Sequence, residues 1–468
     1  MESMSFSGSQ PPQPYPLSMR IRWMAGRIIK WALRTAILVL AVAAIAWSGA
    51  FIAGCSGLKT ALKSVSADPT LAYTAPGDWD KPAEGENAAP YFASSFALMS
   101  YSFPQQAGAI RKVIAKGWES LAEEEREELR KWLKSQELAF DLAAKGADKP
   151  TCKYSREWWA DQAKTVEMEP WRISIPELEG VEQMCEALVA LAQSRAADGK
   201  FAEAREAIRV AVGVAESLRD DPFLQSQRCR VSQVSLILEN VTELVPRSVT
   251  RENLEAWLKI IPASNAFDGC LERAGKWLLK ERVDLFQGSA DRYWFWQRIY
   301  YRWGPMDFSK MLRRRLADPL FESDAIKCLE DTERLVEIWR KPYLEAKAEA
   351  AALEKEWNEW KESRHPTAPL VWHVCPSLRL ERMQMARARC AMVRTGLEWE
   401  LAKVKTGSYP EKCETIDPLT GTSFRLEEGP ARLTGANVAG RAYVSKKLAN
   451  GRVTSTPKLE PNTWVLRK

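Results

Sequence analysis

The chain has 468 residues and is poor in the residue types that most metal and acid–base chemistry requires. It contains only two histidines, His365 and His373, and it has no Cys-x-x-Cys pair. A zinc site needs three or four ligands at matched spacing, and the pair His373 and Cys375 has no second cluster to complete such a site. The same pair has poor spacing for a thiol that is activated by a neighbouring base. These absences argue against zinc binding and against cysteine–histidine catalysis.

Sequence motifs of nucleotide binding and hydrolysis are also missing. The chain has no G-x-S-x-G, Walker A, G-x-G-x-x-G, H-E-x-x-H or EF-hand pattern. The segment from Asp417 to Thr422 is superficially similar to the phosphorylated-aspartate motif of ion-pumping ATPases, but it has one inserted residue and lacks the lysine. We therefore predict a non-enzymatic protein without a cofactor or bound metal. A pair of catalytic carboxylates stays open as an alternative, because acidic residues are abundant.

Charge is plentiful but nearly balanced, with 67 basic and 61 acidic residues. Much of the excess comes from a short basic cluster near the N-terminus, made of Arg20, Arg22, Arg27, Lys30 and Arg34. A nucleic-acid-binding protein usually carries a longer face of lysine and arginine. The sequence therefore predicts no nucleic-acid partner.

An uncharged apolar run, Thr35 to Gly54, follows this cluster. Twenty helical residues span about 30 Å, the thickness of a bilayer's hydrocarbon core. Basic residues before the run predict that its N-terminal end stays in the cytoplasm. We expect residues 1–34 to form a disordered, basic cytoplasmic leader and residues 35–54 to form a transmembrane helix. The rest of the chain would then be extracytoplasmic, for example periplasmic.

Cys55 offers a second interpretation of the same segment. The sequence Ile52-Ala53-Gly54-Cys55 has the pattern of a bacterial lipobox, in which the cysteine is acylated and the preceding signal is removed. Both alternatives, a single-pass inner-membrane anchor and a lipoprotein, predict a protein that is tethered to a membrane. The eight other cysteines permit disulfides, but the sequence leaves their pairing open.

Residues 55–89 are expected to form a linker, and residues 90–375 an extracytoplasmic helical domain. Its best-marked part is a helical hairpin that turns at Gly199, where small residues of the second helix allow close packing. Asp221 is expected to cap a third helix with Pro222 at its first position. The hairpin resembles one tetratricopeptide repeat. Because only one such unit is visible and a solenoid needs about three, we predict a divergent helical array.

A highly charged stretch runs from Glu119 to Phe140. Its spacing favours a half-exposed helix that is supported by pairs of opposite charge one turn apart. A specific acidic binding face is the alternative interpretation of the same residues.

The last part of the chain, residues 376–468, is expected to combine a long helix with a small antiparallel sheet of three to five strands that packs against it. Gly407 would end the helix, and Tyr409 with Pro410 would begin a reversal of the chain. Asp417, Pro418 and Gly421 would then form a turn, because proline fixes φ and glycine allows a positive φ.

Four short motifs together resemble a family of membrane-anchored helical proteins that planctomycete-type bacteria carry in many copies. They are Gly85 to Tyr91, Pro150 to Cys152, Gly199 with Asp221 to Leu224, and Gly407 to Pro410 with Asp417 to Gly421. The family has no assigned activity, so the resemblance implies no catalytic residues. The tail is also similar to the globular end of type II secretion pseudopilins, in which a long helix enters a Gly-x-Tyr-Pro turn.

The sequence thus predicts a mainly α-helical, membrane-anchored scaffold of the cell envelope that binds a protein partner. A structural component of a secretion or pilus-like apparatus is the first alternative, which the tail suggests. An extracytoplasmic hydrolase that uses paired carboxylates is the second. The sequence leaves the identity of the partner open.

Overall fold

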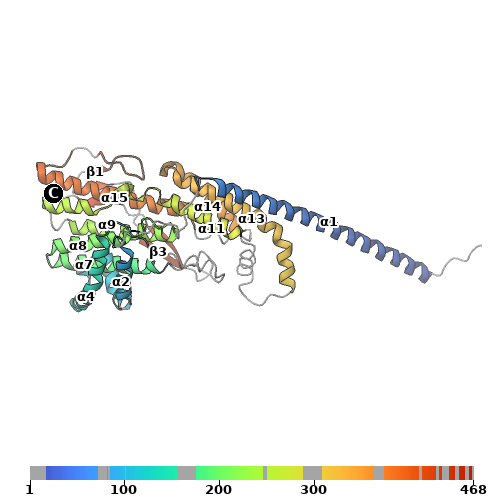
Figure 1. Ribbon diagram of the computed structural model, residues 1–468, viewed down its shortest axis with the longest axis horizontal. Coiled ribbons are helices and arrows are strands. Elements are labelled where there is room, and N and C mark those ends of the chain that lie inside the picture. Colours follow the sequence, from blue (N-terminus) through green and yellow to red (C-terminus); the bar gives the residue numbers. More distant parts are fainter. Residues whose placement is uncertain are drawn as a thin grey trace, which may run out of the picture.

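The computed structural model shows a mainly helical protein whose first helix projects far from a helical head (Figure 1). The residues that the structure describes are 17–71, 82, 85–100, 102–154, 175–245, 250–287, 308–362, 374–410, 414–427, 432–434, 442–447, 453–458 and 463–465.

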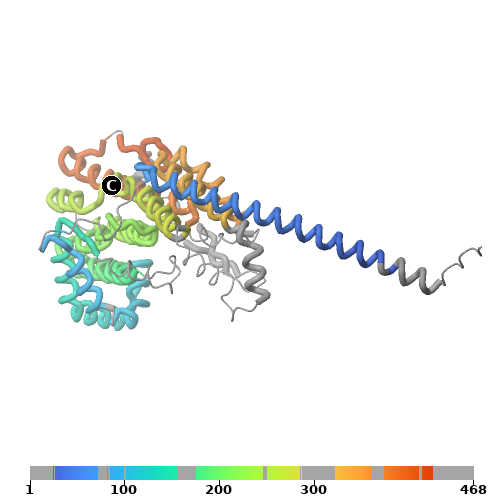
Figure 2. Tube along the Cα trace, turned by 45° about the vertical axis from the view of Figure 1, so that its right-hand side comes forward, coloured from blue at the N-terminus to red at the C-terminus, as the bar shows by residue number. Residues whose placement is uncertain are grey.

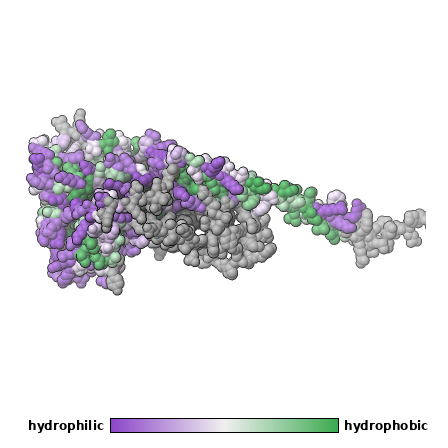
Figure 3. All heavy atoms as spheres, in the orientation of Figure 1, coloured by the Kyte–Doolittle hydropathy of each residue, from purple (hydrophilic) through white to green (hydrophobic). Residues whose placement is uncertain are grey.

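The projecting helix α1 runs without interruption over Leu17–Ala67. It therefore includes half of the expected leader, all of the apolar run and the start of the expected linker, so residues 17–34 are helical where a disordered leader was expected. The large apolar side chains between Ile28 and Ile52 are mostly exposed, and Figure 3 shows them along the middle of the projecting helix. The length and composition of this helix are sufficient to cross a bilayer.

The last turns of α1 belong to the head. Leu58, Leu62 and Val65 are buried at helical spacing, so one stripe of the helix packs against α13, Phe308–Arg340. Gly57 lies so close to α13 that an added Cβ would meet Ile326 at 3.0 Å. The apolar run and the head are thus joined by one continuous helix, which Figure 2 shows from a second direction.

The remaining helices of the head stack around one continuous hydrophobic core that extends from Leu58 to Phe424. This core includes residues on both sides of position 376, where a domain boundary was expected. The helices that surround this core are α2 Ala89–Ser100, α3 Phe103–Lys116, α4 Glu123–Ser135, α5 Glu137–Ala147, α7 Pro176–Ala197, α8 Phe201–Glu216, α9 Leu224–Leu244, α10 Arg251–Ile260, α11 Cys270–Gln287, α14 Tyr343–Glu362 and α15 Pro376–Thr406. Two short 3₁₀ turns cover Trp118–Ser120 and Ser264–Phe267.

The charged stretch that was expected to be one helix is divided. Trp118–Ser120 forms a 3₁₀ turn, α4 ends at Ser135, and α5 begins at Glu137. Gln136 separates the two helices, and its backbone N–H donates hydrogen bonds to the backbone carbonyls of Trp132 and Leu133. Trp132 and Leu133 of α4 and Phe140 of α5 are all buried, so both helices contribute to the core.

Close helix packing in the centre of the head depends on small residues. The interface between α7 and α8 buries alanines of both helices, including Ala192, Ala204 and Ala211. Gly213 of α8 lies against α5, where an added Cβ would be 2.6 Å from the Cβ of Ala147. Such contacts allow helix axes to approach closely. They hold α5, α7 and α8 together as neighbours.

A buried ion pair ties α8 to α9. The guanidinium of Arg230 is fully buried and lies 2.8 Å from the carboxylate of Glu216. It also donates to the carbonyl of Ala266 at 2.8 Å and lies over the ring of Phe267. Because removing one partner would leave an uncompensated buried charge, this cluster specifies how the two helices pack.

Beyond Phe424 the described residues include five short strands. β1, β2 and β5 form an antiparallel sheet in the order β1-β2-β5, and β3 pairs antiparallel with β4. Their bounds are β1 Arg425–Glu427, β2 Arg432–Thr434, β3 Ala442–Lys447, β4 Val453–Lys458 and β5 Thr463–Val465. The expected packing of a terminal sheet against the last helix stays a prediction, because the side chains of these strands lie outside the described residues.

Candidate functional site

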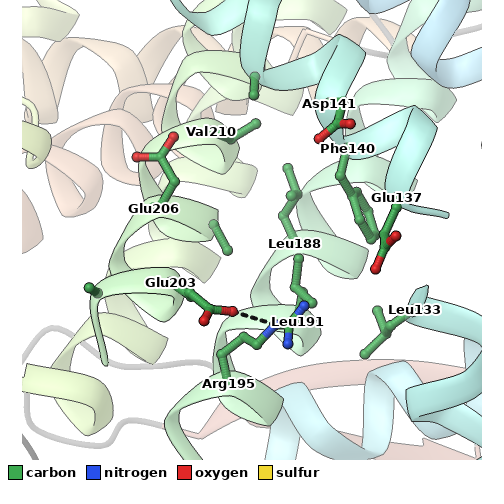
Figure 4. Close-up of a pocket in the computed structure, with 13 residues that line it drawn as sticks. Leu133, Glu137, Phe140, Asp141, Leu188, Leu191, Arg195, Glu203, Glu206 and Val210 are labelled. Carbon is green, nitrogen blue, oxygen red and sulfur yellow. Dashed lines mark ion pairs between the residues drawn. The ribbon is translucent and has the colours of Figure 1, made fainter. Parts of the chain in front are cut away.

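A groove between two helical hairpins is the candidate functional site, and we call it the acidic groove. It has a volume of about 500 Å³ and lies where α4 and α5 face α7 and α8 (Figure 4). Its lining residues are Leu133, Glu137, Phe140, Asp141, Ala144, Leu188, Leu191, Arg195, Ala202, Glu203, Glu206, Ala207 and Val210.

The floor of the groove is apolar. Leu133, Phe140, Leu188 and Val210 are buried beneath it, while Leu191 is half-buried and faces the opening. These side chains come from four helices, so the floor exists only because the hairpins pack side by side. An apolar floor of this kind binds a ligand by removing its apolar surface from water.

The two rims of the groove carry four exposed carboxylates. Glu137 and Asp141 are one turn apart on α5, and Glu203 and Glu206 are nearly one turn apart on α8. Figure 4 shows the two pairs on opposite sides of the apolar floor. Among the described residues, Arg195 is the one basic residue that lines the groove. The groove therefore carries a net negative charge and favours a cationic ligand.

Neighbouring arginines neutralise one rim in part. Arg195 lies 3.3 Å from Glu203, and Arg209 lies 2.6 Å from Glu206. Hydrogen bonds to Glu206 raise the pKa of Arg209. Among the described residues, Glu137 and Asp141 take part in no ion pair, so the α5 rim presents the stronger unbalanced charge.

The arrangement is suited to binding rather than to proton transfer. A catalytic acid is usually held in an apolar pocket that favours its protonated form. The four carboxylates of the groove are instead exposed to water. Exposed acids around an apolar floor instead provide a surface for an amphipathic segment with positive charges.

Cys55, the predicted lipidation site, lies within the continuous helix α1 and is half-buried. Its thiol faces α13 and donates to the carboxylate of Glu322 across 3.7 Å. The position is therefore at the junction between the apolar part of α1 and the part that packs on the head. The eight described cysteines, which exclude Cys413, are free thiols.

The predicted helix start at Pro222 is wrong by two residues. Helix α9 begins at Leu224, and Phe223 is its extended N-cap residue. Asp221 is buried and accepts a hydrogen bond from the hydroxyl of Ser226 at 2.9 Å, so it still contacts the first turn. Its backbone carbonyl is held by the side-chain amide of Gln227, which places Asp221 and Pro222 in a connection before the helix. Gly199 has a φ of +76° in the turn between α7 and α8.

The tail motif forms a compact turn on α15. Gly407 is the C-cap residue of this helix with a φ of +82°, and Gly421 has a φ of +69°. Asp417 is almost fully buried and accepts the amide of Leu419 at 2.9 Å. The side-chain amide of Gln384 donates to the carbonyl of Pro418 at 2.5 Å. The turn thus fastens the chain to α15.

The aromatic residue of the same motif also contacts α15. The hydroxyl of Tyr409 donates to the carboxylate of Glu400 at 3.1 Å, and its ring packs near Trp399. Pro410 follows at a half-buried position. These contacts give the motif a structural role at the end of the helix.

The weak sequence candidates for metal or nucleophile chemistry are not assembled into a site in the part of the chain that the structure describes. No group of three or more histidine, cysteine or acidic side chains is arranged there to hold a metal ion. Cys375 is the N-cap residue of α15 in a left-handed conformation, with a φ of +43°. His365 and His373 lie outside the described residues.

The acidic groove was not predicted from the sequence. An acidic binding face between Glu119 and Phe140 was one interpretation of that stretch, but nothing in the local patterns connects it with the helical hairpin at Gly199. A usable signal was present in the spacing of Glu137 with Asp141 and of Glu203 with Glu206, beside apolar residues of the same helices. That the two faces would meet was not visible from local patterns.

Comparisons with known proteins gave no relative from which a function could be carried over. No protein-family model matches the chain. No curated protein and no solved structure is similar to it at a significant level.

Proposed function

We propose that this chain is a membrane-anchored docking protein of the cell envelope. Helix α1 would cross the inner membrane with its N-terminus in the cytoplasm and hold the head on the extracytoplasmic side. The basic residues that precede the apolar run support this orientation. The continuity of α1 into the head supports an anchor that positions the head at a fixed orientation to the membrane.

The acidic groove is the observation that carries the docking role. Its apolar floor and four exposed carboxylates suit an amphipathic helix with an apolar stripe that is flanked by lysine or arginine. Apolar burial would supply most of the affinity, and the charges would supply specificity and a faster association. The partner would therefore be a protein with a basic amphipathic segment.

Two alternatives have less support. In pseudopilins the helix that enters the tail is continuous with the membrane segment, whereas here α1 and α15 are separate helices. A carboxylate hydrolase would need converging acids in a cleft that excludes water, whereas the acids of the groove are exposed on opposite rims. In our proposal the tail forms a small antiparallel sheet at the end of the chain, which has a structural role and no activity of its own.

The docking role is tested with two synthetic helical peptides that have the same leucine face and carry either lysine or glutamate on the polar face. The full chain is placed in phosphatidylcholine nanodiscs, and empty nanodiscs report binding to lipid. We expect the lysine peptide to bind at least about tenfold more tightly than the glutamate peptide, a difference of roughly 1.4 kcal/mol. Fluorescence anisotropy measures both affinities.

A charge-reversed variant shows whether the groove is responsible. Glu137→Lys with Asp141→Lys changes two exposed rim residues, and we expect the preference for the lysine peptide to disappear. Glu127→Lys with Glu128→Lys makes the same change in charge at two exposed positions of α4 that do not line the groove. Equal effects of the two variants, or equal binding of the two peptides, would refute docking in the groove.

The form of the anchor is tested separately at Cys55. In the transmembrane form, Cys55→Ala leaves the apparent mass and membrane retention of the chain unchanged, and globomycin has no effect on its processing. If the variant instead accumulates as an unprocessed precursor, or globomycin blocks processing of the natural chain, the anchor is a lipid on Cys55. Both outcomes keep the head at a membrane, so this experiment is independent of the groove.

A further inference from the structure

A second concave site lies between α9 and α15, and we call it the arginine pocket. It has a volume of about 310 Å³, at the small end of the range of ligand pockets in proteins. Its lining includes Arg228, Val231 and Leu236 of α9 and Arg379, Arg382 and Met383 of α15. It shares no lining residue with the acidic groove.

The two helices that form the pocket run in the same direction. Arg228 near the start of α9 lies close enough to Arg379 near the start of α15 to lower the pKa of that residue. Ten residues further along α15, Arg389 forms an ion pair with Glu239 of α9 at 2.6 Å. Ten helical residues correspond to about 15 Å, so the pocket is elongated along the two helices.

Positive charge is concentrated at the end of the pocket where both helices begin. Arg228, Arg379 and Arg382 line this end, and the N-terminus of a helix itself carries a partial positive charge. Burial, together with the charges of Arg228 and Arg382, lowers the pKa of Arg379 to about 10. The nearby Glu354 is engaged by the backbone amide of Ser377 at 3.0 Å. Arg379 also donates its Nε–H to the carbonyl of Val374 at 3.3 Å, and a bound anion would add a favourable partner for the positive charge gathered at this end.

The rest of the lining is mainly apolar, with Gln227, Ser232 and Ser235 of α9 among it, and polar groups close the far end of the pocket. Val231, Leu236 and Met383 line the middle, and methionine is a flexible side chain that adapts to apolar ligands. At the far end, Arg389 is buried, and its Nε atom has no hydrogen-bond partner among the described residues. An apolar body that enters between the helices would therefore lie between the three-arginine end and the Arg389–Glu239 pair.

We propose that the arginine pocket binds a small anionic amphiphile, with its carboxylate or phosphate at Arg228, Arg379 and Arg382 and its apolar chain along Val231 and Met383. Guanidinium groups bind both anions through paired hydrogen bonds, which explains the choice of arginine over lysine at this end. The site is separate from the proposed docking groove and does not depend on it.

The source of such a ligand is either the membrane or a soluble pool. The arginine end belongs to the part of α15 that contacts α14 through Ser377 and Glu354. α14 packs on α13, and α13 packs on α1, so this end lies in the half of the head that adjoins the projecting helix (Figure 1). A single-chain lipid product and a soluble alkyl acid share the same chemistry.

The proposal is tested by equilibrium dialysis of radiolabelled octyl phosphate and octanoate with the full chain in phosphatidylcholine nanodiscs. Binding to empty nanodiscs is subtracted. We expect one saturable site for each ligand, with octanol and inorganic phosphate at least about tenfold weaker. If octanol binds as tightly as octyl phosphate, the anionic group does not contribute to binding. If inorganic phosphate binds as tightly, the apolar chain does not contribute. Either result overturns the proposal.

Arginine variants place the ligand within the head. Arg228→Gln with Arg379→Gln should weaken octyl phosphate binding at least about tenfold. Arg251→Gln with Arg334→Gln removes the same charge from two exposed positions outside the pocket and should leave binding unchanged. If the double variant does not fold, the single variant Arg228→Gln provides the test, because Arg228 is exposed and its substitution should not disturb the core. Unchanged affinity in both pocket variants contradicts the proposal.

The same assay separates the two sources. Nanodiscs in which part of the phosphatidylcholine is replaced by phosphatidylglycerol present an anionic lipid to the pocket. Competition with octyl phosphate in these discs assigns the pocket to membrane lipids, and lack of competition assigns it to soluble amphiphiles. Each result supports the shared chemistry and identifies its origin.

Discussion

The acidic groove and the arginine pocket occupy one helical head but have opposite charge and different construction. Exposed carboxylates border the groove and remain hydrated, so they act at little cost to the fold. The pocket instead places the partly buried Arg379 and Arg382 beside the exposed Arg228, near two helix N-termini. Charges of one sign are held together at a cost to stability. We infer that the groove steers a large cationic partner and that the pocket holds a small anion.

The two sites also depend on different contacts for their walls. The groove needs the close approach of α5 and α8 at Gly213. The pocket needs α15, which the Asp417 turn holds through Gln384. Substitutions at these two positions should therefore affect one site and spare the other.

The largest effect is expected for Asp417→Ala. The carboxylate is buried and accepts the amide of Leu419, so its loss should destabilise the head by about 2 kcal/mol. Thermal unfolding should show a lower melting temperature, and octyl phosphate binding should weaken more than peptide binding. Asp417→Asn keeps an acceptor and should be milder. A variant that unfolds like the natural chain while it loses peptide binding in the groove would show that Asp417 has a functional role.

A smaller effect is expected for Gly213→Ala. The added methyl group would be 2.6 Å from the Cβ of Ala147, and overpacking of this kind typically costs about 1–3 kcal/mol. The better helix propensity of alanine offsets about 1 kcal/mol, so we expect a net loss near 1 kcal/mol and weaker peptide binding. Gly108→Ala, at an open position of α3 with no atom near the new Cβ, should raise the melting temperature instead. The same sign for both variants would contradict the packing argument.

The smallest effect is expected for Arg379→Gln in the absence of ligand. Removing the charge ends its repulsion by Arg228 and Arg382, so stability should rise by about 0.5 kcal/mol or less. The gain should shrink at high salt, because salt screens repulsion between accessible charges. Arg334→Gln, which removes an arginine paired with Glu356 at 2.9 Å, should give no such gain. Melting curves at low and high salt measure both variants, and a loss of stability at low salt for Arg379→Gln would argue against mutual repulsion.

Local features of the fold were predictable because short-range physics determines them. The apolar run after the basic cluster predicts a long membrane-length helix, and α1 contains it. The turn at Gly199 and the helix end at Gly407 are positions where the backbone needs a positive φ, which glycine adopts without strain. The chain is mainly helical, as its three- and four-residue periodicity indicates.

Predictions that depend on the ends of elements or on their continuation were less successful. The leader and linker are partly absorbed into α1, because helical residues on both sides continue the apolar segment without a break. The charged stretch before Phe140 is divided at Gln136, and its apolar spacing does not indicate this break, because Trp132, Leu133 and Phe140 would also share one face of a continuous helix. Pro222 precedes α9 because Asp221 is held in the connection by Ser226 and Gln227.

The sequence alone determined that the chain is helical, that it carries a membrane-length apolar helix, and where its clearest turns lie. Each of these depends on residues within a few positions of one another. Only the tertiary structure decided that Glu137 and Asp141 face Glu203 and Glu206, and that Arg228 meets Arg379 and Arg382. Such meetings depend on which helix faces pack together, and packing is a property of the whole core rather than of any short segment.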